Sequence, residues 1–437
     1  MSASGALWRN WARTEAVRPR RVERPGGVGA VQRAVVAAAG AGLPIKAVGS
    51  GHSFTGIAVA PGVQLDLHEL TGIIRVDAAA RQVTVAAGTP LHRLVALLDS
   101  HGLALPNLGD IDRQTISGAI STGTHGTGSG LGGLATQVVA LTLVTGDGSL
   151  LTVSGTENAE LLPAAALGLG ALGIIVDVTL QCVPGFLLHA VDRMEPLDAV
   201  LEQYLDRSRA ADHFEFFWFP HTRSALTKTN TRLPPGAERR PLGRVSRWID
   251  DELLANGAFR GICALGSAAP ALVPGFNRLA ERLSGGREYS DASARVFVTS
   301  RTVRFREMEY ALPLAAVTAA LAEVRALIER RGWRISFPIE VRSAAADGLW
   351  LSTASGRETG YIAVHRYHRD NHTEYFRAVE DIMRAHGGRP HWGKIHYQDA
   401  ESLRALYPRF DDFLLVRDRL DPERRFGNPY LERVLGS

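Results

Sequence analysis

Cysteine is scarce in this chain: Cys182 and Cys263 are the only two among 437 residues. Two isolated cysteines cannot build a disulfide framework or a cysteine-rich metal site, and they suit a reducing compartment, so we expect a cytoplasmic protein. No stretch approaches the run of about 18 apolar residues that a membrane-spanning helix needs. The first residues also lack the apolar core of a signal peptide, so no membrane span is expected.

A large excess of one charge is also absent. Lys and Arg number 49 and Asp and Glu 45, which leaves a formal net charge of +4. No basic run is interleaved with aromatic residues, so nucleic acid is not an expected partner. Hydrophobic residues make up 45% of the chain and charged residues 22%, as in folded globular proteins. A chain of this length exceeds one compact core, and two domains are expected.

The first part of the chain shows both helical and strand periodicity. Residues 27–40 are rich in alanine and valine and predict a helix, and residues 89–102 place their leucines on one stripe and predict a second. A proline-capped helix is predicted near residues 157–167. Strands are predicted over residues 44–48, 62–67, 81–88, 138–145, 151–153 and 173–183.

The pattern changes from about residue 186. "HFEFFWF", residues 213–219, predicts an aromatic-rich strand, and a period of two returns around residues 338–342 and 361–367. Residues 313–332 carry apolar side chains at helical spacing, whereas the Pro/Gly/Arg-rich stretch 232–246 predicts an exposed loop. We therefore predict an α+β second domain, in which an antiparallel sheet carries helices on one face.

Three tracts are rich in glycine. "GLGALG", residues 168–173, matches the dinucleotide-binding fingerprint, but a helical segment precedes it and a strand follows, which reverses the Rossmann order. "VGSGHSF", residues 48–54, and "ISTGTHGTGSGLGG", residues 120–133, each surround one histidine with glycine and hydroxyl residues. Each alone fits a tight turn. Because glycine lets backbone N–H groups approach an anion, the two together predict a pyrophosphate held between two loops.

The "KAVGSGHSF" loop, the stretch "ALPNLGDIDRQTISGAISTGTHGTG" and the segment "RPHWGKIHY" together resemble the vanillyl-alcohol-oxidase-type FAD flavoproteins. Within that family the similarity points to the sugar-1,4-lactone oxidoreductases, which include L-gulono-1,4-lactone dehydrogenase and D-arabinono-1,4-lactone oxidase, and to the related alditol oxidases. The resemblance implies a two-domain α+β fold of the FAD-binding PCMH/VAO type. The FAD-binding domain would span residues 1–185 and be completed by residues 388–437, with a substrate (cap) domain over residues 186–387.

The resemblance implies FAD as the cofactor and places His52 where relatives attach the flavin covalently. The alternative is a histidine that only hydrogen-bonds within the loop. Gly109 falls beside the oxygen-reactive carbon of the flavin, where a residue without a side chain permits O₂ to approach. The other residues expected around the cofactor are Val48, Gly49, Ser50, Gly51, Ser53, Ser117, Ser121, Thr122, Gly123, Thr124, His125, Gly126, Gly173, Ile174 and His396.

Five residues are expected to act on the substrate. Glu340 and Arg342 are two apart in a predicted strand and so share a face, and with Lys394 they match active-site positions of the alditol oxidases. His365 stands where those enzymes have threonine and Asp110 where they have serine, which favours the lactone branch. Lys394 would stabilise negative charge on the reduced flavin. The base that accepts the hydroxyl proton stays open between Glu340 and His365.

The sequence therefore predicts an enzyme that oxidises a CH–OH group of an aldono-1,4-lactone of the L-gulono or D-arabinono type. Electrons would pass through FAD to O₂ or to another redox carrier. Two alternatives stay open: an oxidase of alditols or other carbohydrates, and a non-catalytic sugar-binding protein with a degenerate flavin site. A zinc hydrolase is not predicted, because His391 and His396 lack the helical i, i+4 pairing of such sites.

Overall fold

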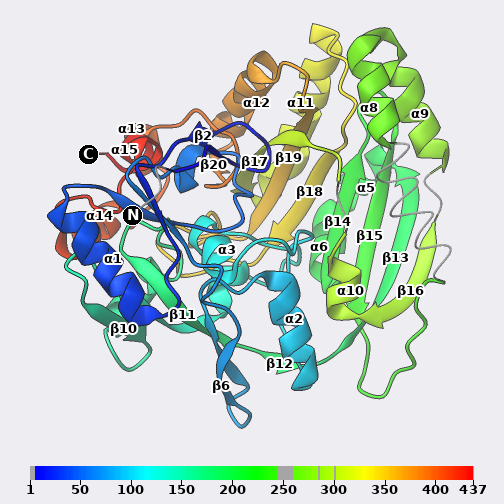
Figure 1. Ribbon diagram of the computed structural model, residues 1–437. Coiled ribbons are helices and arrows are strands. Elements are labelled where there is room, and N and C mark those ends of the chain that lie inside the picture. Colours follow the sequence, from blue (N-terminus) through cyan, green and yellow to red (C-terminus); the bar gives the residue numbers. More distant parts are fainter. Residues whose placement is uncertain (1–4, 244–258, 284–285, 300–301, 437) are drawn as a thin grey trace.

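The computed structural model describes residues 5–243, 259–283, 286–299 and 302–436. Two kinds of sheet divide the chain (Figure 1): smaller sheets built from its first part, and one eight-stranded sheet built from its second part. Within the described residues no helix is both long and apolar enough to cross a lipid bilayer. The antiparallel second sheet with its helices confirms the predicted α+β class.

The first part contains a small parallel sheet and a larger antiparallel one. Helix α1 connects two parallel strands in the manner of a crossover. Its buried side chains, Val31, Ala34, Val35 and Ala38, enter the core that it shares with both sheets. The parallel sheet has the order β3-β5-β4, with β3 Arg21–Glu23, β5 Val63–Asp66, β4 Ile45–Val48 and α1 Val28–Gly40. The antiparallel sheet has the order β10-β9-β11-β7-β6, with β10 Leu150–Ser154, β9 Val138–Val144, β11 Ile174–Gln181, β7 Gln82–Ala86 and β6 Ile73–Asp77.

The second part is dominated by the eight-stranded antiparallel sheet, and helices α11 and α12 lie across one of its faces (Figure 1). Its order is β16-β13-β15-β14-β18-β19-β17-β20, with β16 Arg287–Ala292, β13 Leu187–Pro196, β15 Ser224–Arg232, β14 His213–Trp218, β18 Ile339–Ala344, β19 Thr359–Tyr367, β17 Phe305–Pro313 and β20 Arg389–Pro390. The helices on that face are α5 Leu197–Glu202, α6 Tyr204–Ala210, α11 Val317–Arg331 and α12 Thr373–Ala385.

Alternation along these strands gives the eight-stranded sheet two different faces. In β14 the side chains of Phe214 and Phe216 enter the apolar core beneath the helices, so that of Glu215 points the other way. The same alternation in β17 buries Met308 in that core and turns its neighbours Glu307 and Glu309 to the opposite face. One face is therefore apolar and helix-covered, and the other carries ionised side chains toward the first part of the chain.

The end of the chain returns to the first part. Trp392 and the helices of residues 400–435 share a core with α1 and β11. Arg389–Pro390, in contrast, still pair with β17 at the edge of the eight-stranded sheet. This distribution supports, as a proposal, a domain boundary near residue 185 and a return just after β20. The helices concerned are α13 Ala400–Arg404, α14 Phe410–Leu420 and α15 Pro429–Leu435.

The second glycine tract divides between two roles. Its second half is built into the eight-stranded sheet: Thr127 Oγ1 donates to Phe214 O at 2.6 Å, and Gly128 N donates to Ser343 O at 2.9 Å. Ser129 Oγ donates to Ser208 O at 2.6 Å. Residues 127–131 therefore join the two parts of the protein, and the cofactor residues predicted in this tract end before them, at Gly126.

Most predicted elements are present at their predicted places, with two corrections. The helix near residues 157–167 shrinks to α4, Leu162–Ala165, after a single 3₁₀ turn. The spacing of Lys394 and His396 in "HWGKIH" also predicts that they share a strand face, but this segment forms no strand after β20, so that prediction is wrong. In the predicted loop 232–246, residues 233–243 are half-buried or exposed and residues 244–246 lie outside the described residues.

The junction at Thr127 yields a stability prediction. Its hydroxyl donates to Phe214 O and accepts from Ser343 N at 3.2 Å, and both groups are buried. Thr127→Val keeps the shape but leaves these groups without a partner, so the free energy of unfolding should fall by about 1–3 kcal/mol. Thr136→Val, which loses an exposed bond to Gly133 O, is the matched control and should change stability by less than about 0.5 kcal/mol. Equal thermal denaturation midpoints for the two variants would contradict this account.

Candidate active site

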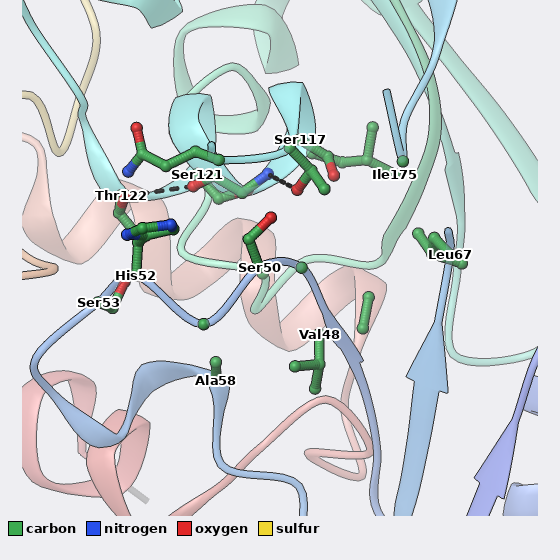
Figure 2. Close-up of a pocket in the computed structure, with 18 of the residues that line it drawn as sticks. Val48, Ser50, His52, Ser53, Ala58, Leu67, Ser117, Ser121, Thr122 and Ile175 are labelled. Carbon is green, nitrogen blue, oxygen red and sulfur yellow. Dashed lines mark hydrogen bonds between the residues drawn. The ribbon is translucent and has the colours of Figure 1, made fainter. Parts of the chain in front are cut away.

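A cavity of about 540 Å³ lies between the first glycine loop and helix α3, Ile116–Thr122. Figure 2 shows Ser50 from the loop pointing toward the same space as Ser117 and Ser121 from α3. The adjoining loop before β11 closes one end of the cavity. The predicted cofactor residues that line it are Val48, Gly49, Ser50, Gly51, His52, Ser53, Ser117, Ser121, Thr122, Gly173 and Ile174.

Two glycines in the first loop are required by its geometry. A Cβ added at Gly49 would lie 2.5 Å from Thr115 Oγ1, which is closer than atoms can approach. Gly51 has φ +67°, in the left-handed region that residues with side chains avoid. The loop therefore turns tightly against α3 only because these positions carry no side chain, and its backbone forms the cavity wall.

The loop backbone is suited to an anion. Among the described residues, the N–H groups of residues 50–53 have no hydrogen-bond acceptor in the protein. Unpaired N–H groups in a glycine-rich turn form a nest for phosphate oxygens. Lys46 also lines this cavity, and its Nζ donates to Gly170 O and Phe426 O at 3.1 Å each. Burial and the charge of Arg417 lower the pKa of Lys46 to about 7, although Asp421 opposes that shift. The cavity thus fits the diphosphate of a dinucleotide.

A second cavity of about 350 Å³ continues from the first, and His52, Ser53, Gln114 and Thr122 line both. Its other walls come from both parts of the chain, because strand β17 and the "HWGK" segment face the first glycine loop across it. Aromatic rings and charged groups meet there. The remaining lining residues include Trp11, Phe54, Asp112, Arg113, Phe305, Glu307, His391, Gly393 and Lys394.

His52 stands at the junction of the two cavities. Its imidazole stacks on the indole of Trp11, with ring centroids 5.9 Å apart and planes inclined by 23°. Burial, together with the charges of Lys394 and Arg113, lowers the pKa of His52 to about 4. The imidazole is therefore neutral at physiological pH, which is the nucleophilic form of the ring.

The two motifs on which the family resemblance rests contact each other directly. Phe54 N donates to Gly393 O at 2.7 Å, and Thr55 Oγ1 donates to Trp392 O at 3.0 Å. Trp392 is fully buried, and its Nε1 donates to Leu351 O at 2.7 Å. The "HWGK" turn is therefore anchored to the glycine loop that carries His52.

Lys394 is held between two buried carboxylates. Its Nζ donates a short hydrogen bond to Glu307 and lies 3.9 Å from Glu309 Oε2. Burial lowers the pKa of Lys394, but the two carboxylates raise it by more, so the ammonium stays charged. Burial likewise raises the pKa of Glu307, yet Lys394 and His365 outweigh it and bring that pKa to about 2. A fixed positive charge therefore faces the second cavity.

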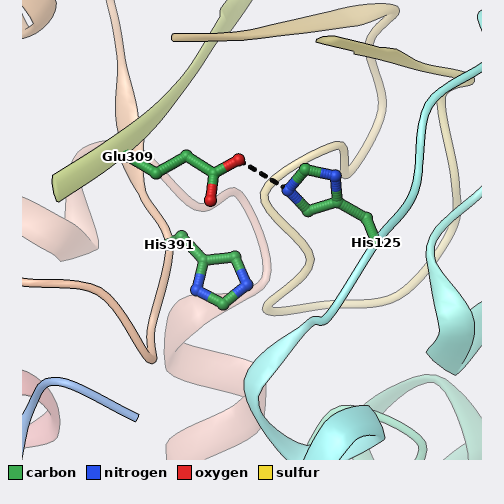
Figure 3. A group of neighbouring side chains, drawn as sticks. All are labelled: His125, Glu309 and His391. Carbon is green, nitrogen blue, oxygen red and sulfur yellow. Dashed lines mark ion pairs between the residues drawn. The ribbon is translucent and has the colours of Figure 1, made fainter. Parts of the chain in front are cut away.

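A second group extends this network behind the cavity (Figure 3). His125 Nε2 lies 2.9 Å from Glu309 Oε1, and His125 Nδ1 lies 2.8 Å from Gly126 O. His391 lies beside them, and burial chiefly lowers its pKa to about 4. The three side chains are close enough to coordinate a metal ion. Because Glu309 already pairs with His125 and Lys394, we interpret the group as a charge network rather than as a metal centre.

Arg342 is the centre of a third cluster on the same sheet face. It pairs with Glu340 through a short contact, with Glu215 at 2.9 Å and with Asp110 at 3.6 Å. Lys228 lies 3.5 Å from the other oxygen of Glu215. The structure therefore brings together Glu340, Arg342 and Asp110, which were predicted from separate segments.

His365 has both ring nitrogens engaged. Its Nδ1 lies 3.0 Å from Pro338 O, and its Nε2 lies 3.5 Å from Glu307 Oε1. Nδ1–H must donate to the carbonyl, so Nε2 faces a carboxylate and not the cavity. This arrangement disfavours His365 as a base. Glu340 also lines neither cavity and is in short contact with Arg342, so its role as the base stays a prediction.

Several predicted residues do not line either cavity. His396 faces α15, where its Nε2 lies 2.8 Å from the hydroxyl of Tyr430. Gly109 packs against the second loop, with His125 O 3.0 Å from a Cβ placed there. Glu340, Arg342 and His365 lie on the face of the eight-stranded sheet behind the second cavity, and Asp110 lies in a loop against Arg342. Four more predicted cofactor residues also line neither cavity: Gly123, Thr124, His125 and Gly126.

Other site residues were not predicted from the sequence. Glu307 and Glu309 alternate along "FREMEYALP", a pattern that is also typical of an exposed strand face. Lys46 begins the first glycine loop but reads as a surface lysine. Trp11 precedes the region of family resemblance. The only available signals were the strand alternation around the glutamates and the unusual tryptophan pair of the N-terminal segment.

Comparison with known proteins identifies the cofactor domain and the fold. A family profile for an FAD binding domain matches residues 19–154, which confirms FAD as the predicted cofactor. A solved solvent-stable cholesterol oxidase aligns with a TM-score of 0.82 over 99% of this chain and 98% of its own, at 19% identity, and shows the fold alone. The predicted FAD-binding fold of the vanillyl-alcohol-oxidase type is therefore confirmed.

Full-length relatives and a second profile give the family. The L-gulono-1,4-lactone dehydrogenase of Mycobacterium tuberculosis (strain ATCC 25618 / H37Rv) is 44% identical over 430 residues, covering 98% of this chain and 99% of the relative. The L-gulonolactone oxidase of Bos taurus is 34% identical, covering 98% of each chain. The profile for D-arabinono-1,4-lactone oxidase matches residues 178–434. The chain therefore belongs to the D-arabinono-1,4-lactone oxidase family of FAD-dependent enzymes.

Proposed function

We propose that this enzyme oxidises a CH–OH group of an aldono-1,4-lactone of the L-gulono or D-arabinono type. The observation that carries the proposal is Lys394, a charged ammonium fixed by two buried carboxylates at the cavity that continues from His52. The names of the full-length relatives support the substrate class. When bound, FAD supplies the two-electron acceptor for the substrate's hydride.

The residues of the two cavities would divide the work of holding the cofactor. The free N–H groups of residues 50–53, with Ser117 and Ser121, would hold the diphosphate. Lys46, whose pKa is about 7, would become charged beside the bound anion, which favours the ammonium form. Lys394 would stabilise negative charge that develops in the second cavity. No reorganisation is needed for that task, because Glu307 and Glu309 already fix the ammonium.

The Arg342 cluster would act on the substrate. Arg342 is a permanent cation whose guanidinium can donate to substrate oxygens or polarise a lactone carbonyl. Glu340, paired with it, would accept the hydroxyl proton. Asp110, on the loop beside the second cavity, would help to orient the sugar. We also propose that His52 bonds covalently to the flavin, since its neutral imidazole lies where both cavities meet.

Substrate oxidation can be tested without presupposing the electron acceptor. The purified protein should absorb visible light near about 450 nm, as a bound flavin does. L-gulono- or D-arabinono-1,4-lactone should bleach that absorbance anaerobically at least about tenfold faster than xylitol or sorbitol. Bleaching by alditols alone would establish the alditol oxidase alternative. A flavin-containing protein that neither class bleaches would contradict the proposal.

The pairing of Lys394 predicts a dependence of stability on pH. The pKa of Glu307 lies at about 2 in the folded protein, below its ordinary value of 4.5, so its stabilisation is complete above about pH 4.5 and is lost as the pH falls toward 2. Lys394→Met leaves the carboxylates without their cation and should cost about 3–5 kcal/mol at pH 7. At pH 4 the carboxylates of the variant should be protonated, because burial raises their pKa once Lys394 is absent. The stability difference between the variant and wild type should therefore be smaller at pH 4 than at pH 7.

Thermal denaturation of wild type and Lys394→Met at both pH values measures this effect. Arg331→Met is the matched control, because it removes a cation whose pairing with Glu374 is exposed. That control should change the denaturation midpoint little at either pH. A difference between Lys394→Met and wild type that stays constant from pH 7 to pH 4 would show that the carboxylates are not held ionised by Lys394.

The electron acceptor can be examined through Gly109. We propose that the missing side chain admits O₂, and an added Cβ would press on His125 O at 3.0 Å and Thr124 Cγ2 at 3.4 Å. Gly109→Ala should slow reoxidation of the reduced enzyme by O₂ and leave anaerobic reduction by the lactone unchanged. Stopped-flow absorbance measures both rates. Gly40→Ala, whose Cβ meets nothing within 4 Å, is the control; equal reoxidation rates in the two variants would reject the gating role.

A further inference from the structure

The N-terminal hairpin lies outside both family profiles, which match residues 19–154 and 178–434, yet it contacts the candidate active site. Strands β1, Trp8–Arg9, and β2, Ala16–Val17, pair antiparallel. The turn between them places Trp11 in the wall of the second cavity. One wall of this cavity therefore comes from a segment that neither profile covers.

The hairpin holds the backbone on both sides of His52. Trp11 N donates to Gly51 O at 2.7 Å, and Asn10 Nδ2 donates to Ser53 O at 2.9 Å. Thr14 Oγ1 donates to Phe54 O at 2.8 Å. Three carbonyl groups within four residues are thus fixed by one short segment. This leaves the backbone of residue 52 little freedom to rotate.

The hairpin is itself rigid enough to serve as a support. Asn10 is buried, and its side chain donates to Thr14 Oγ1 at 2.7 Å and accepts from Glu15 N at 3.0 Å. A Cβ at position 51 would lie 3.1 Å from the ring of Trp8, so Gly51 allows the loop to approach the hairpin closely. The bonds within the hairpin therefore hold its shape, and its bonds to residues 51–54 hold the glycine loop against it.

The indole of Trp11 fixes the side chain of residue 52 as well as its backbone. It stacks on the imidazole at 5.9 Å between centroids, within the range of favourable aromatic pairs. Its own position is set by edge contacts with Phe54 at 6.2 Å and Phe305 at 5.3 Å, and Arg304 Nε donates to its carbonyl at 3.0 Å. Both parts of the protein thus clamp the tryptophan over the histidine.

We propose that Trp11 is a positioning residue for His52, and that the N-terminal hairpin orients the imidazole for covalent attachment of FAD. The inference rests on the proposed function, in which His52 carries the flavin. The burial that Trp11 contributes also agrees with the lowered pKa of His52, about 4, because it favours the neutral ring.

The attachment step balances with dioxygen as the oxidant. A C–N bond forms between an imidazole nitrogen and the 8α-methyl carbon, while the imidazole N–H bond and one methyl C–H bond break. The two electrons and two protons released are taken up by the flavin, and O₂ then removes them as hydrogen peroxide. The step requires the imidazole lone pair to point along one direction, which is what a clamped ring provides.

The test compares four variants for bound and covalent flavin. Trp11→Leu removes the stacking ring, Trp11→Phe keeps an aromatic ring, and Thr14→Val removes one of the three supporting bonds. Trp350→Leu is the matched control, since Trp350 is also half-buried but lines neither cavity. Total flavin is read from visible absorbance, and the covalent fraction from the fluorescence that stays with acid-precipitated protein during reconstitution with FAD.

Trp11→Leu should bind FAD but form the acid-stable fraction about three- to tenfold more slowly, the range that an aromatic pair is worth. Thr14→Val should slow the attachment of flavin by a smaller factor than Trp11→Leu does. If Trp11→Leu does not fold, the attachment rate of Thr14→Val tests the positioning role. Trp11→Phe and Trp350→Leu should match wild type. Wild-type rates of attachment in both Trp11→Leu and Thr14→Val would overturn the proposal.

A second measurement separates this proposal from the attachment itself. If wild type releases all its flavin in acid, covalent attachment is refuted, and the positioning role is then decided in apoprotein from riboflavin-limited cells. Diethyl pyrocarbonate should modify His52 several-fold faster in Trp11→Leu than in wild type, with the exposed His101 as internal reference in peptide mass spectra. Equal His52 reactivity would overturn the positioning role independently of the flavin bond.

Discussion

Ionised side chains buried on the inner face of the eight-stranded sheet determine how the two parts of this protein fit together. A charge removed from water costs several kcal/mol unless an opposite charge lies against it. Here the signs alternate from strand to strand, so each charge has its partner on the neighbouring strand. The row runs through Arg287, Asp192, Lys228, Glu215 and Arg342. At the cavity, Lys394 of the turn after β20 stands between Glu307 and Glu309 of β17. Two residues from the first part of the chain join these charges, Asp110 beside Arg342 and His125 beside Glu309.

This constraint explains why the predicted catalytic residues come from distant segments. Lys394 stays charged because Glu307 and Glu309 lie beside it. Lys394 in turn holds the pKa of both carboxyls low, together with three histidines, His365, His125 and His391. His125 links the network to the second glycine loop, and the "HWGK" turn links it to the first. The two glycine loops and the charged face of the sheet are therefore connected through ion pairs and hydrogen bonds. Moving one of these segments would leave a buried charge without its partner.

The sequence was informative where one residue type has one plausible use. Gly49, Gly51 and His52 predicted a tight glycine loop, which lines a cavity in the structure, and its binding of an anion stays a prediction. The period of two around Glu340 and Arg342 predicted a shared face, and the two side chains are in contact. It was uninformative where one pattern has two uses. Alternating glutamates in β17 resemble a solvated strand face, since the lysine that neutralises them lies almost ninety residues away along the chain. The second glycine tract likewise gave no sign that residues 127–131 serve the other sheet.

That docked glycine segment also bears on the order in which the chain acquires its structure. Residues 127–131 have their partners on β14 and β18, and Ser343 leaves the ribosome about 200 residues after Gly128. Contacts of such long sequence separation form late, because their loop entropy is lost before they contribute stability. During synthesis, residues 127–131 therefore stay without their partners until β18 has been made. Over that period the N-terminal half is the part of the chain that a chaperone would have to protect.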